Sequence, residues 1–251
     1  MTRSDGGDCG HYVEVPIPAG AEVVKAGESR RVIAIAGGVR PGAEPAAGEG
    51  VEWRRLCEGE MAFVLEAGAR LDLCLVILPG ANIGTKVGID LVGENAKASL
   101  SGVYICGGEQ EVSVGIQMRH KVGHCRSKQY FAGVLAGRSK SSFNGRIVVA
   151  PDASGTEAYQ ENHNLLASDG AVAQTLPQLE IYTDDVACSH GATVGRLNEE
   201  EQFYMRSRGI PEAEARVLQM VSFVAPALGI IPEGAVRETL EMCIEEELRS
   251  I

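Results

Sequence analysis

The two residues best suited to chemistry are Cys188 and His190, which lie two positions apart in the run Asp184–Gly195. Apolar and polar residues alternate from Leu179 to Val186, which predicts a strand, and alternate residues of a strand share a face. Cys188 and His190 would then lie about 7 Å apart along the strand, at roughly 3.3 Å per residue. The imidazole could lower the pKa of the thiol or bind a metal ion directly. A half-buried thiol beside a hydrogen-bonded imidazole fits the same spacing.

A second group of residues, His120, His124 and Cys125, places two imidazoles and a thiol within six positions. On a helix both histidines would share a face, as in metalloproteases, but Gly123 and the absence of Glu directly after His120 remove that motif. We therefore expect this group in a strand or loop, with a structural role.

The nearby carboxylates give a weaker signal. Asp184 and Asp185 are adjacent, so in a strand they face opposite sides and cannot act together on one bond as acid and base. They are expected to be solvated or to cap a turn. Glu180, His163 and Asn164 could support either the strand network or the chemical site, and the sequence does not separate these roles.

The elements that position these residues should form one large domain, or a core with a small appendage, as expected for 251 residues. A formal charge of -11 argues against nucleic acid or an anionic membrane as the main partner. No apolar run approaches the ~20 residues of a spanning helix, and the first residues lack the apolar core of a signal peptide. The sequence predicts a cytoplasmic protein.

The seven cysteines are scattered and form no Cys-x-x-Cys pair, which argues against a disulfide framework or a zinc module. Most of them are expected to be small buried hydrophobic residues, with Cys188 as the exception. Neither a Walker-type nor a dinucleotide-binding glycine pattern is present, so the sequence predicts no nucleotide site.

Residues 51–195 are predicted to form a β core, because short strand candidates recur between turn residues without helical periodicity. The candidates are Ala62–Leu65, Leu71–Leu78, Ile89–Leu91, Ala98–Tyr104, Glu111–Met118, Ser142–Val149, Ala171–Gln174 and Leu179–Tyr182. This pattern suits a sandwich, a barrel or a solenoid. Recurring small residues, such as Gly80, Gly93 and Gly102, favour stacked coils, although a sandwich stays equally open on pattern alone.

The two flanking regions differ from this core. Residues 1–50 should hold strands near 13–18 and 32–36 and a loop over 41–50. Residues 196–251 should form a small helical domain.

The helices of residues 196–251 are predicted from their caps. Asn198 followed by Glu201 fits an N-terminal cap, and Gly209 fits the C-terminal cap of the same helix. A second helix should begin at Pro211 and a third near Pro232. Apolar residues recur every four positions along the third helix, at Val236, Leu240, Ile244 and Leu248.

Several independent motifs follow one another between residues 130 and 211. They are Tyr130–Gly137, Phe143–Ile147, Ala158–Leu166, Pro177–Ile181, Ser189–Gly195 and Tyr204–Pro211. Together these motifs resemble the SufB/SufD family of iron–sulfur cluster assembly proteins, and more closely its SufD type.

The resemblance implies a mainly β fold, with a right-handed β-helix-like solenoid core over residues 51–195 and a small C-terminal α-helical domain over residues 196–251. It implies a scaffold or accessory subunit of a cytosolic SUF-type assembly complex rather than an enzyme. The core would pair with a SufB-like subunit or with a second copy of the chain. The helical end would dock an ABC-type ATPase called SufC.

For the chemical site, the resemblance implies that Cys188 and His190 bind a transient iron–sulfur cluster, or its iron and sulfide precursors, with no tightly bound cofactor. SufB-type sequences carry a cysteine where this chain reads Thr175–Gln178, and an acidic residue where it has Gly191. Because thiolates are the main ligands of iron–sulfur clusters, their absence argues against independent scaffolding by this chain.

Two other functions are weighed against this one. A β-solenoid enzyme acting on polysaccharide needs carboxylates that converge on one strand face, and the sequence offers no such set. A purely structural subunit, which docks the ATPase without touching the cluster, is the alternative.

The segment Tyr204–Leu228 is the predicted ATPase-binding region, because it and its flank carry more apolar residues than three helices can bury. These residues are Phe203, Val217, Val221, Phe223 and Val224. The competing expectation is that they pack on the open end of the β core.

Overall fold

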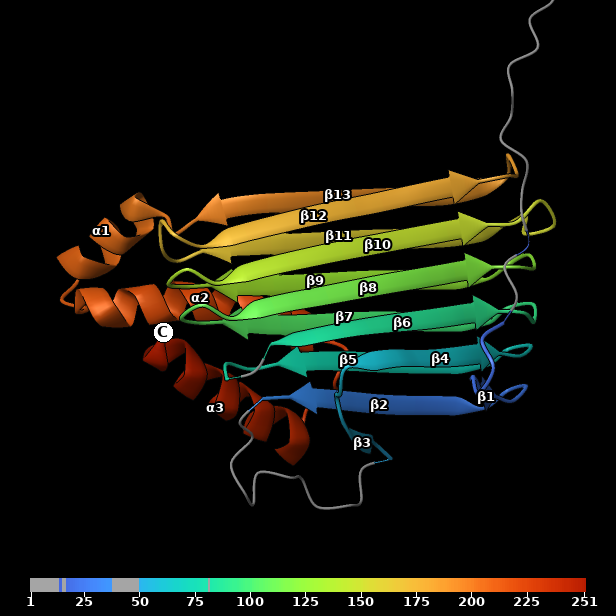
Figure 1. Cartoon of the computed structure of the whole chain (residues 1–251), viewed down its shortest axis with the longest axis horizontal. Helices are drawn as coiled ribbons and strands as arrows, with labels where there is room; N and C mark the ends of the chain where they lie inside the picture. Colours follow the sequence, from blue (N-terminus) through green and yellow to red (C-terminus); the bar gives the residue numbers. More distant parts are fainter. Residues whose placement is uncertain (1–13, 15–16, 38–49, 81) are drawn as a thin grey trace, which may run out of the picture.

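The computed structural model describes residues 14, 17–37, 50–80 and 82–251, and these contain thirteen strands followed by three helices (Figure 1). The strands are β1 Glu22–Val24, β2 Ser29–Ala36, β3 Glu52–Arg55, β4 Gly59–Leu65, β5 Arg70–Ile77, β6 Ile83–Leu91, β7 Lys97–Cys106, β8 Glu111–His120, β9 Arg126–Leu135, β10 Lys140–Val149, β11 Thr156–Leu166, β12 Val172–Ile181 and β13 Val186–Arg196. The helices are α1 Glu199–Ser207, α2 Glu212–Leu228 and α3 Ala235–Ser250.

The strands build a β-solenoid from two parallel sheets. One sheet has the order β1-β4-β6-β8-β10-β12, and the other has the order β13-β11-β9-β7-β5-β2-β3. From β4 onward, consecutive strands alternate between the two sheets, so each coil contributes one strand to each (Figure 1). Ala158 of β11 pairs with Cys188 of β13, 30 residues further along the chain. A sandwich is excluded, because every strand pairing among the described residues is parallel and, from β4 onward, joins successive coils.

The interior between the sheets changes character along the solenoid. The inner face of β5 carries Leu71, Leu73, Leu75 and Ile77, all fully buried in the main apolar core. The inner positions of β9 and β11 are largely polar: Ser127, Gln129, Gln160, Asn162 and Asn164 are all buried. Asn162 donates to the Tyr104 hydroxyl (2.9 Å), and Asn164 donates to Asn162 Oδ1 (2.8 Å), so part of this polar interior is internally satisfied.

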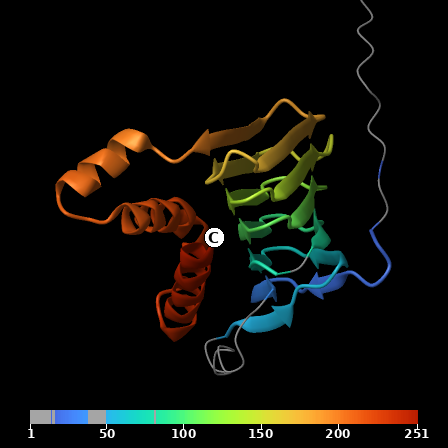
Figure 2. The same ribbon diagram turned by 60° about the vertical axis from the view of Figure 1, so that its left-hand side comes forward.

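Helices α2 and α3 cover the outer face of the seven-stranded sheet (Figure 2). They form a second apolar core with outward-facing strand residues such as Cys74, Val76 and Val103. Val217 and Val224 of α2 are buried there. Helix packing on the open end of the solenoid is therefore the wrong expectation, since the helices lie against a sheet face instead.

The capping predictions for the helices are confirmed. Asn198 Oδ1 accepts from the backbone N–H groups of Glu200 (2.9 Å) and Glu201 (3.2 Å), which starts α1. Gly209 follows α1 with a φ of 89°, the left-handed conformation that favours glycine. Helix α2 begins directly after Pro211, and α3 begins at Ala235, three residues beyond Pro232.

Three sequence predictions for the strands need correction. The continuous strand from Leu179 to Val186 is wrong, because β12 ends at Ile181 and β13 begins at Val186. The two short candidates 171–174 and 179–182 belong to the single strand β12, which tolerates Pro177 because it lies at a sheet edge. Strands β9 and β11 were not among the candidates, since their polar inner residues interrupt the apolar alternation.

The predictions for residues 1–50 are only partly covered by the described residues. The strand at 32–36 is confirmed within β2. The strand near 13–18 and the loop over 41–50 fall mostly outside the described residues.

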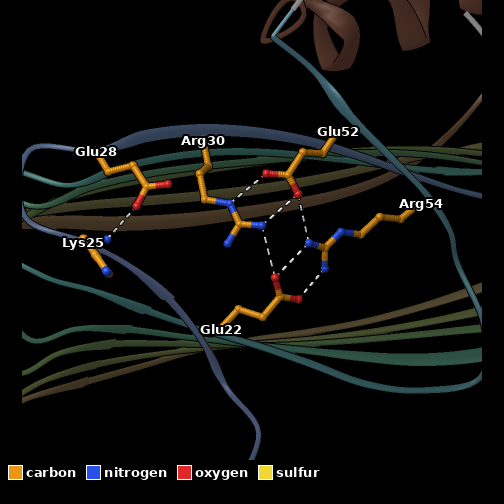
Figure 3. Close-up of polar contacts among 6 residues, drawn as sticks. All are labelled: Glu22, Lys25, Glu28, Arg30, Glu52 and Arg54. Atoms are coloured by element: carbon orange, nitrogen blue, oxygen red, sulfur yellow. Dashed lines mark hydrogen bonds and ion pairs between the residues drawn. The ribbon is translucent and has the colours of Figure 1, made fainter. Parts of the chain in front are cut away.

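The N-terminal end of the solenoid is closed by charged side chains (Figure 3). Arg30 donates to both carboxylate oxygens of Glu52 (2.8 and 2.7 Å) and to Glu22 (3.1 Å). Arg54 also binds both Glu22 and Glu52. Because Glu22 belongs to one sheet while Arg30, Glu52 and Arg54 belong to the other, this network ties the two sheets together.

Candidate functional site

Strand β13, which carries both predicted site residues, is the edge strand of the seven-stranded sheet. Its described neighbour is β11 on one side, and the other side has no described strand. Cys188 packs against the interior core, so the residues of its face point inward, whereas Ser189 faces out and is exposed. Cys188 and His190 therefore share the inner face of an edge strand, as the spacing predicts.

The Cys188 thiol is half-buried, and burial raises its pKa. A backbone hydrogen bond at Ala158 acts in the opposite direction but more weakly. The thiol is therefore protonated at neutral pH in the single chain, and the expected lowering of its pKa by His190 is not observed. A bound metal ion would displace this proton, since metal binding deprotonates a coordinating thiol.

The His190 side chain is exposed at the mouth of the solenoid interior. Its partner in the parallel register is Gln160 of β11, which lies on the same inner face and is completely buried. Gln160 lies inside the run Ala158–Leu166 but was not singled out from the sequence. The available signal was a long polar side chain at an inward-facing position of a strand.

The group His120, His124 and Cys125 does not assemble into a site. His120 ends β8 inside the solenoid, where its Nε2 lies 2.8 Å from Ser127 Oγ, and burial lowers its pKa to about 4. His124 lies in the following turn with a φ of 57°, and the Cys125 thiol donates to the carbonyl oxygen of Gly93 (3.3 Å). The structural role expected for these residues agrees with this placement.

Glu180 and the His163-Asn164 pair also have structural partners. Glu180 forms an ion pair with Arg146 (2.5 Å), and Asp184-Asp185 lies in the bend that joins β12 to β13. His163 Nδ1 lies 2.8 Å from Thr193 Oγ1 on the outer face of the sheet, opposite to Cys188. Glu180 and His163 thus link neighbouring strands, and neither joins Cys188 and His190.

Among the described residues, no three His, Cys, Asp or Glu side chains lie close enough to hold a metal ion. Cys188 and His190 can therefore supply two ligands at most, whereas iron in a cluster commonly takes four. Their position on an edge strand would let a second chain supply the others.

Helix α1 presents the most exposed aromatic side chains of the described residues, Phe203 and Tyr204. Tyr204 and Met205 line a groove with Leu218 of α2. By contrast, Val221 and Phe223 are partly buried against the core beneath α2. Of the five apolar residues expected to exceed the capacity of the helices, Phe203 alone is largely exposed. No described helix is long and apolar enough to cross a membrane.

Comparison with known proteins identifies one family. The family described as "SUF system FeS cluster assembly, SufBD core domain" matches residues 59–223. The iron–sulfur cluster assembly protein SufD of Escherichia coli is 37% identical over 149 residues, which cover 59% of this chain and 35% of that protein. An iron–sulfur cluster assembly SufBD family protein of Mycobacterium bovis is 34% identical over 181 residues, which cover 69% of this chain and 46% of that protein. The chain thus spans between about a third and a half of the length of these curated relatives.

Proposed function

The chain belongs to the SufBD core family of the SUF iron–sulfur cluster assembly system, and on this premise we propose that it acts as a SufD-like scaffold or accessory subunit of a cytosolic assembly complex. In this role it carries nascent iron and sulfide together with a partner subunit and does not turn over a small substrate. The observation that carries the proposal is the inner face of β13, where Cys188 and His190 lie together. They lie at the C-terminal end of the solenoid, which we call the open end because no described strand pairs with the outer edges of β12 and β13.

Pairing of two core subunits through this open end would complete the site. The last strands of both sheets, β12 and β13, have unpaired edges among the described residues, and exposed edges favour association with another chain. Apolar side chains are exposed there, including Leu176 of β12 and Val194 of β13. The partner, a SufB-like subunit or a second copy, would then supply the ligands that this chain lacks.

Docking of a SufC-like ABC ATPase on α1 would couple this interface to nucleotide binding. Only Leu197 and Asn198 separate the last residue of β13 from the first residue of α1, so a displacement of α1 acts directly on the site strand. Gln219 of α2 holds the start of α1 by donating to Asn198 O (3.0 Å) and Glu201 Oε2 (2.8 Å). ATPase dimerisation would shift α1 and open the core interface where Cys188 and His190 lie.

The direct test compares Cys188→Ala and His190→Ala with Ser189→Ala. The complex is purified without oxygen with its ATPase, and its iron and sulfide are measured. The two site variants should lose about tenfold in iron and sulfide, as expected for lost ligands, while Ser189→Ala retains them. Equal content in all three variants would support the alternative, a purely structural subunit that docks the ATPase without touching the cluster.

The docking test compares two exposed apolar residues on different helices. Phe203→Asp on α1 should weaken ATPase binding at least tenfold, because it places a charge in the centre of the contact. Met242→Asp on α3, at a similarly exposed position, is the matched control and should leave binding unchanged. Deletion of residues 198–251 is unsuitable, since α2 and α3 cover the apolar outer face of the sheet.

A further inference from the structure

Two buried glutamines in the solenoid interior are left without hydrogen-bond partners. Gln160 is 0% exposed and Gln129 is 1% exposed, and neither the amide oxygen nor the amide nitrogen of either residue has a partner among the described residues. A buried polar group without a hydrogen-bond partner destabilises the folded state. Leucine at these positions would avoid that cost. Leu100, which pairs with Gln129 in the preceding coil, occupies the equivalent position there.

That register row leads directly to the site. It runs from Leu73 and Leu100 to Gln129, Gln160 and His190, one residue from each successive strand of the sheet. Adjacent strands lie about 4.8 Å apart, so the Gln160 amide is within reach of the His190 ring, whereas Gln129 lies a further strand away. The interior becomes polar in the coils that approach His190.

The opposite sheet leaves room for the Gln160 amide. A Cβ atom at Gly145 of β10 would lie 1.5 Å from Gln160 Nε2, which is far inside contact distance. Gly145 has no positive φ that would demand glycine, so the space for the amide explains the residue at this position. The nitrogen faces this wall, which leaves the amide oxygen to accept a hydrogen bond from another group.

We propose that Gln160 is a positioning residue for His190: its amide oxygen accepts a hydrogen bond from His190 Nδ1–H and so presents Nε2 to iron. A histidine that binds a metal through one nitrogen commonly donates its other N–H to a fixed acceptor, which sets the tautomer and the ring orientation. The proposal rests on the proposed function of His190 as an iron ligand. It also explains why an otherwise unsatisfied amide is kept inside the solenoid.

The experiment compares Gln160→Leu with Gln129→Leu in the full chain. Gln129→Leu removes a buried amide with no partner, and Gln160→Leu removes one whose nitrogen has none, so both should keep the midpoint of urea unfolding close to that of wild type. The tautomer of His190 is read from its ring ¹⁵N chemical shifts at a pH where the ring is neutral. The affinity for Fe²⁺ alone is measured by anaerobic titration.

Gln160→Leu should lower the fraction of His190 protonated on Nδ1 and weaken Fe²⁺ binding about tenfold, while Gln129→Leu leaves both unchanged. Gln160→Glu, whose carboxylate keeps an acceptor oxygen at the same reach, should retain the wild-type tautomer and remain informative if the leucine variant does not fold. The proposal is overturned if Gln160→Leu leaves the His190 tautomer as it is in wild type, or if Gln160→Glu shifts it.

The same data separate this proposal from the proposed function. If Gln160→Leu shifts the tautomer while His190→Ala keeps its iron and sulfide, Gln160 positions a histidine that is not a ligand, and the proposed function fails. If His190→Ala loses iron and sulfide while Gln160→Leu leaves the tautomer unchanged, the function stands and the positioning role fails.

Discussion

The two ends of the solenoid are built in opposite ways. At the N-terminal end the edge strands β1 and β3 contain three and four residues, and the network of Glu22, Arg30, Glu52 and Arg54 ties the two sheets together (Figure 3). At the C-terminal end the edge strands β12 and β13 contain ten and eleven residues, and much of their surface is exposed. Short edges rich in charge resist pairing with other chains, whereas long edges with few charges favour it.

Under the proposed function, this difference makes the C-terminal end the one that would receive a partner subunit. At the closed end, Arg30 and Arg54 pair with Glu22 and Glu52 within the chain. The open end exposes apolar side chains and carries the half-buried Cys188 thiol beside His190. Under the proposed function, one open and one closed end would favour the pairing of two subunits over end-to-end filaments.

The largest expected effect is on core pairing. Leu176→Lys at the open end should weaken the complex with a SufB-like subunit, or the homodimer, about 100-fold, because an unpaired charge would be buried at the contact. Val23→Lys is the matched control: Val23 of β1 is 48% exposed and Leu176 is 54% exposed. Sedimentation velocity measures both variants. An equal loss of assembly in the two would refute the assignment of the ends.

Thiol reactivity should also differ between the ends. Cys57 follows β3 at the closed end and is exposed, whereas burial raises the pKa of Cys188. Because the thiolate is the reactive form, iodoacetamide should modify Cys188 about tenfold more slowly than Cys57 at pH 7. Adding the partner subunit should protect Cys188 further and leave Cys57 unchanged. Mass spectrometry of the two peptides gives both rates, and partner protection of Cys57 instead would contradict the comparison.

The ionic network should affect stability and not assembly. Arg54→Ala leaves Glu22 with Arg30 as its cation and should cost about 1 kcal/mol of unfolding free energy, since these groups are partly exposed. Arg138→Ala, which removes a highly exposed pair with Glu109, should change that energy by less than about 0.5 kcal/mol. Urea unfolding measures both variants. If Arg54→Ala lost core pairing, the prediction that this network affects stability alone would be wrong.

The smallest effect concerns acid stability. The hydrogen bond from Arg54 is the main cause that lowers the pKa of Glu22 from 4.5 to about 2. The ionised Glu22 therefore stabilises the folded state fully above pH 4.5, and this stabilisation is lost as the pH falls toward 2. Burial lowers the pKa of His120 from 6.5 to about 4, so stability also falls between pH 6.5 and 4, where only the unfolded state binds that proton. Glu22→Gln should make the loss of stability below pH 4.5 less steep and leave the loss between pH 6.5 and 4 that is due to His120 unchanged. Urea unfolding in steps of pH tests this, and an unchanged slope below pH 4.5 would count against the network.

Much of the fold could be predicted from local signals. The helix caps at Asn198 and Gly209 depend on side-chain type at fixed offsets, which the sequence displays directly. The choice between solenoid and sandwich depends on which strands pair. The alternation of apolar and polar residues within one strand does not contain that long-range information. Strands β9 and β11 were missed because polar residues such as Gln129 and Gln160 occupy their inner face.

The candidate site was predicted only in part. The shared face of Cys188 and His190 follows from strand periodicity, and the structure confirms it. The edge position of β13 and the direction of the Cys188 pKa shift could not be predicted, since both depend on how the last coil stacks. Gln160 could be identified only from the strand register, which pairs it with His190.

The unbroken register between coils has a consequence for how such chains can diverge. Each coil adds about 30 residues and one strand spacing of about 4.8 Å, as the pairing of Ala158 with Cys188 shows. Insertion or loss of a whole coil in the middle would therefore change the distance between the two ends in fixed steps while leaving both ends intact. The solenoid works as an adjustable spacer, whose length evolution or design can alter by duplication without redesigning either terminus.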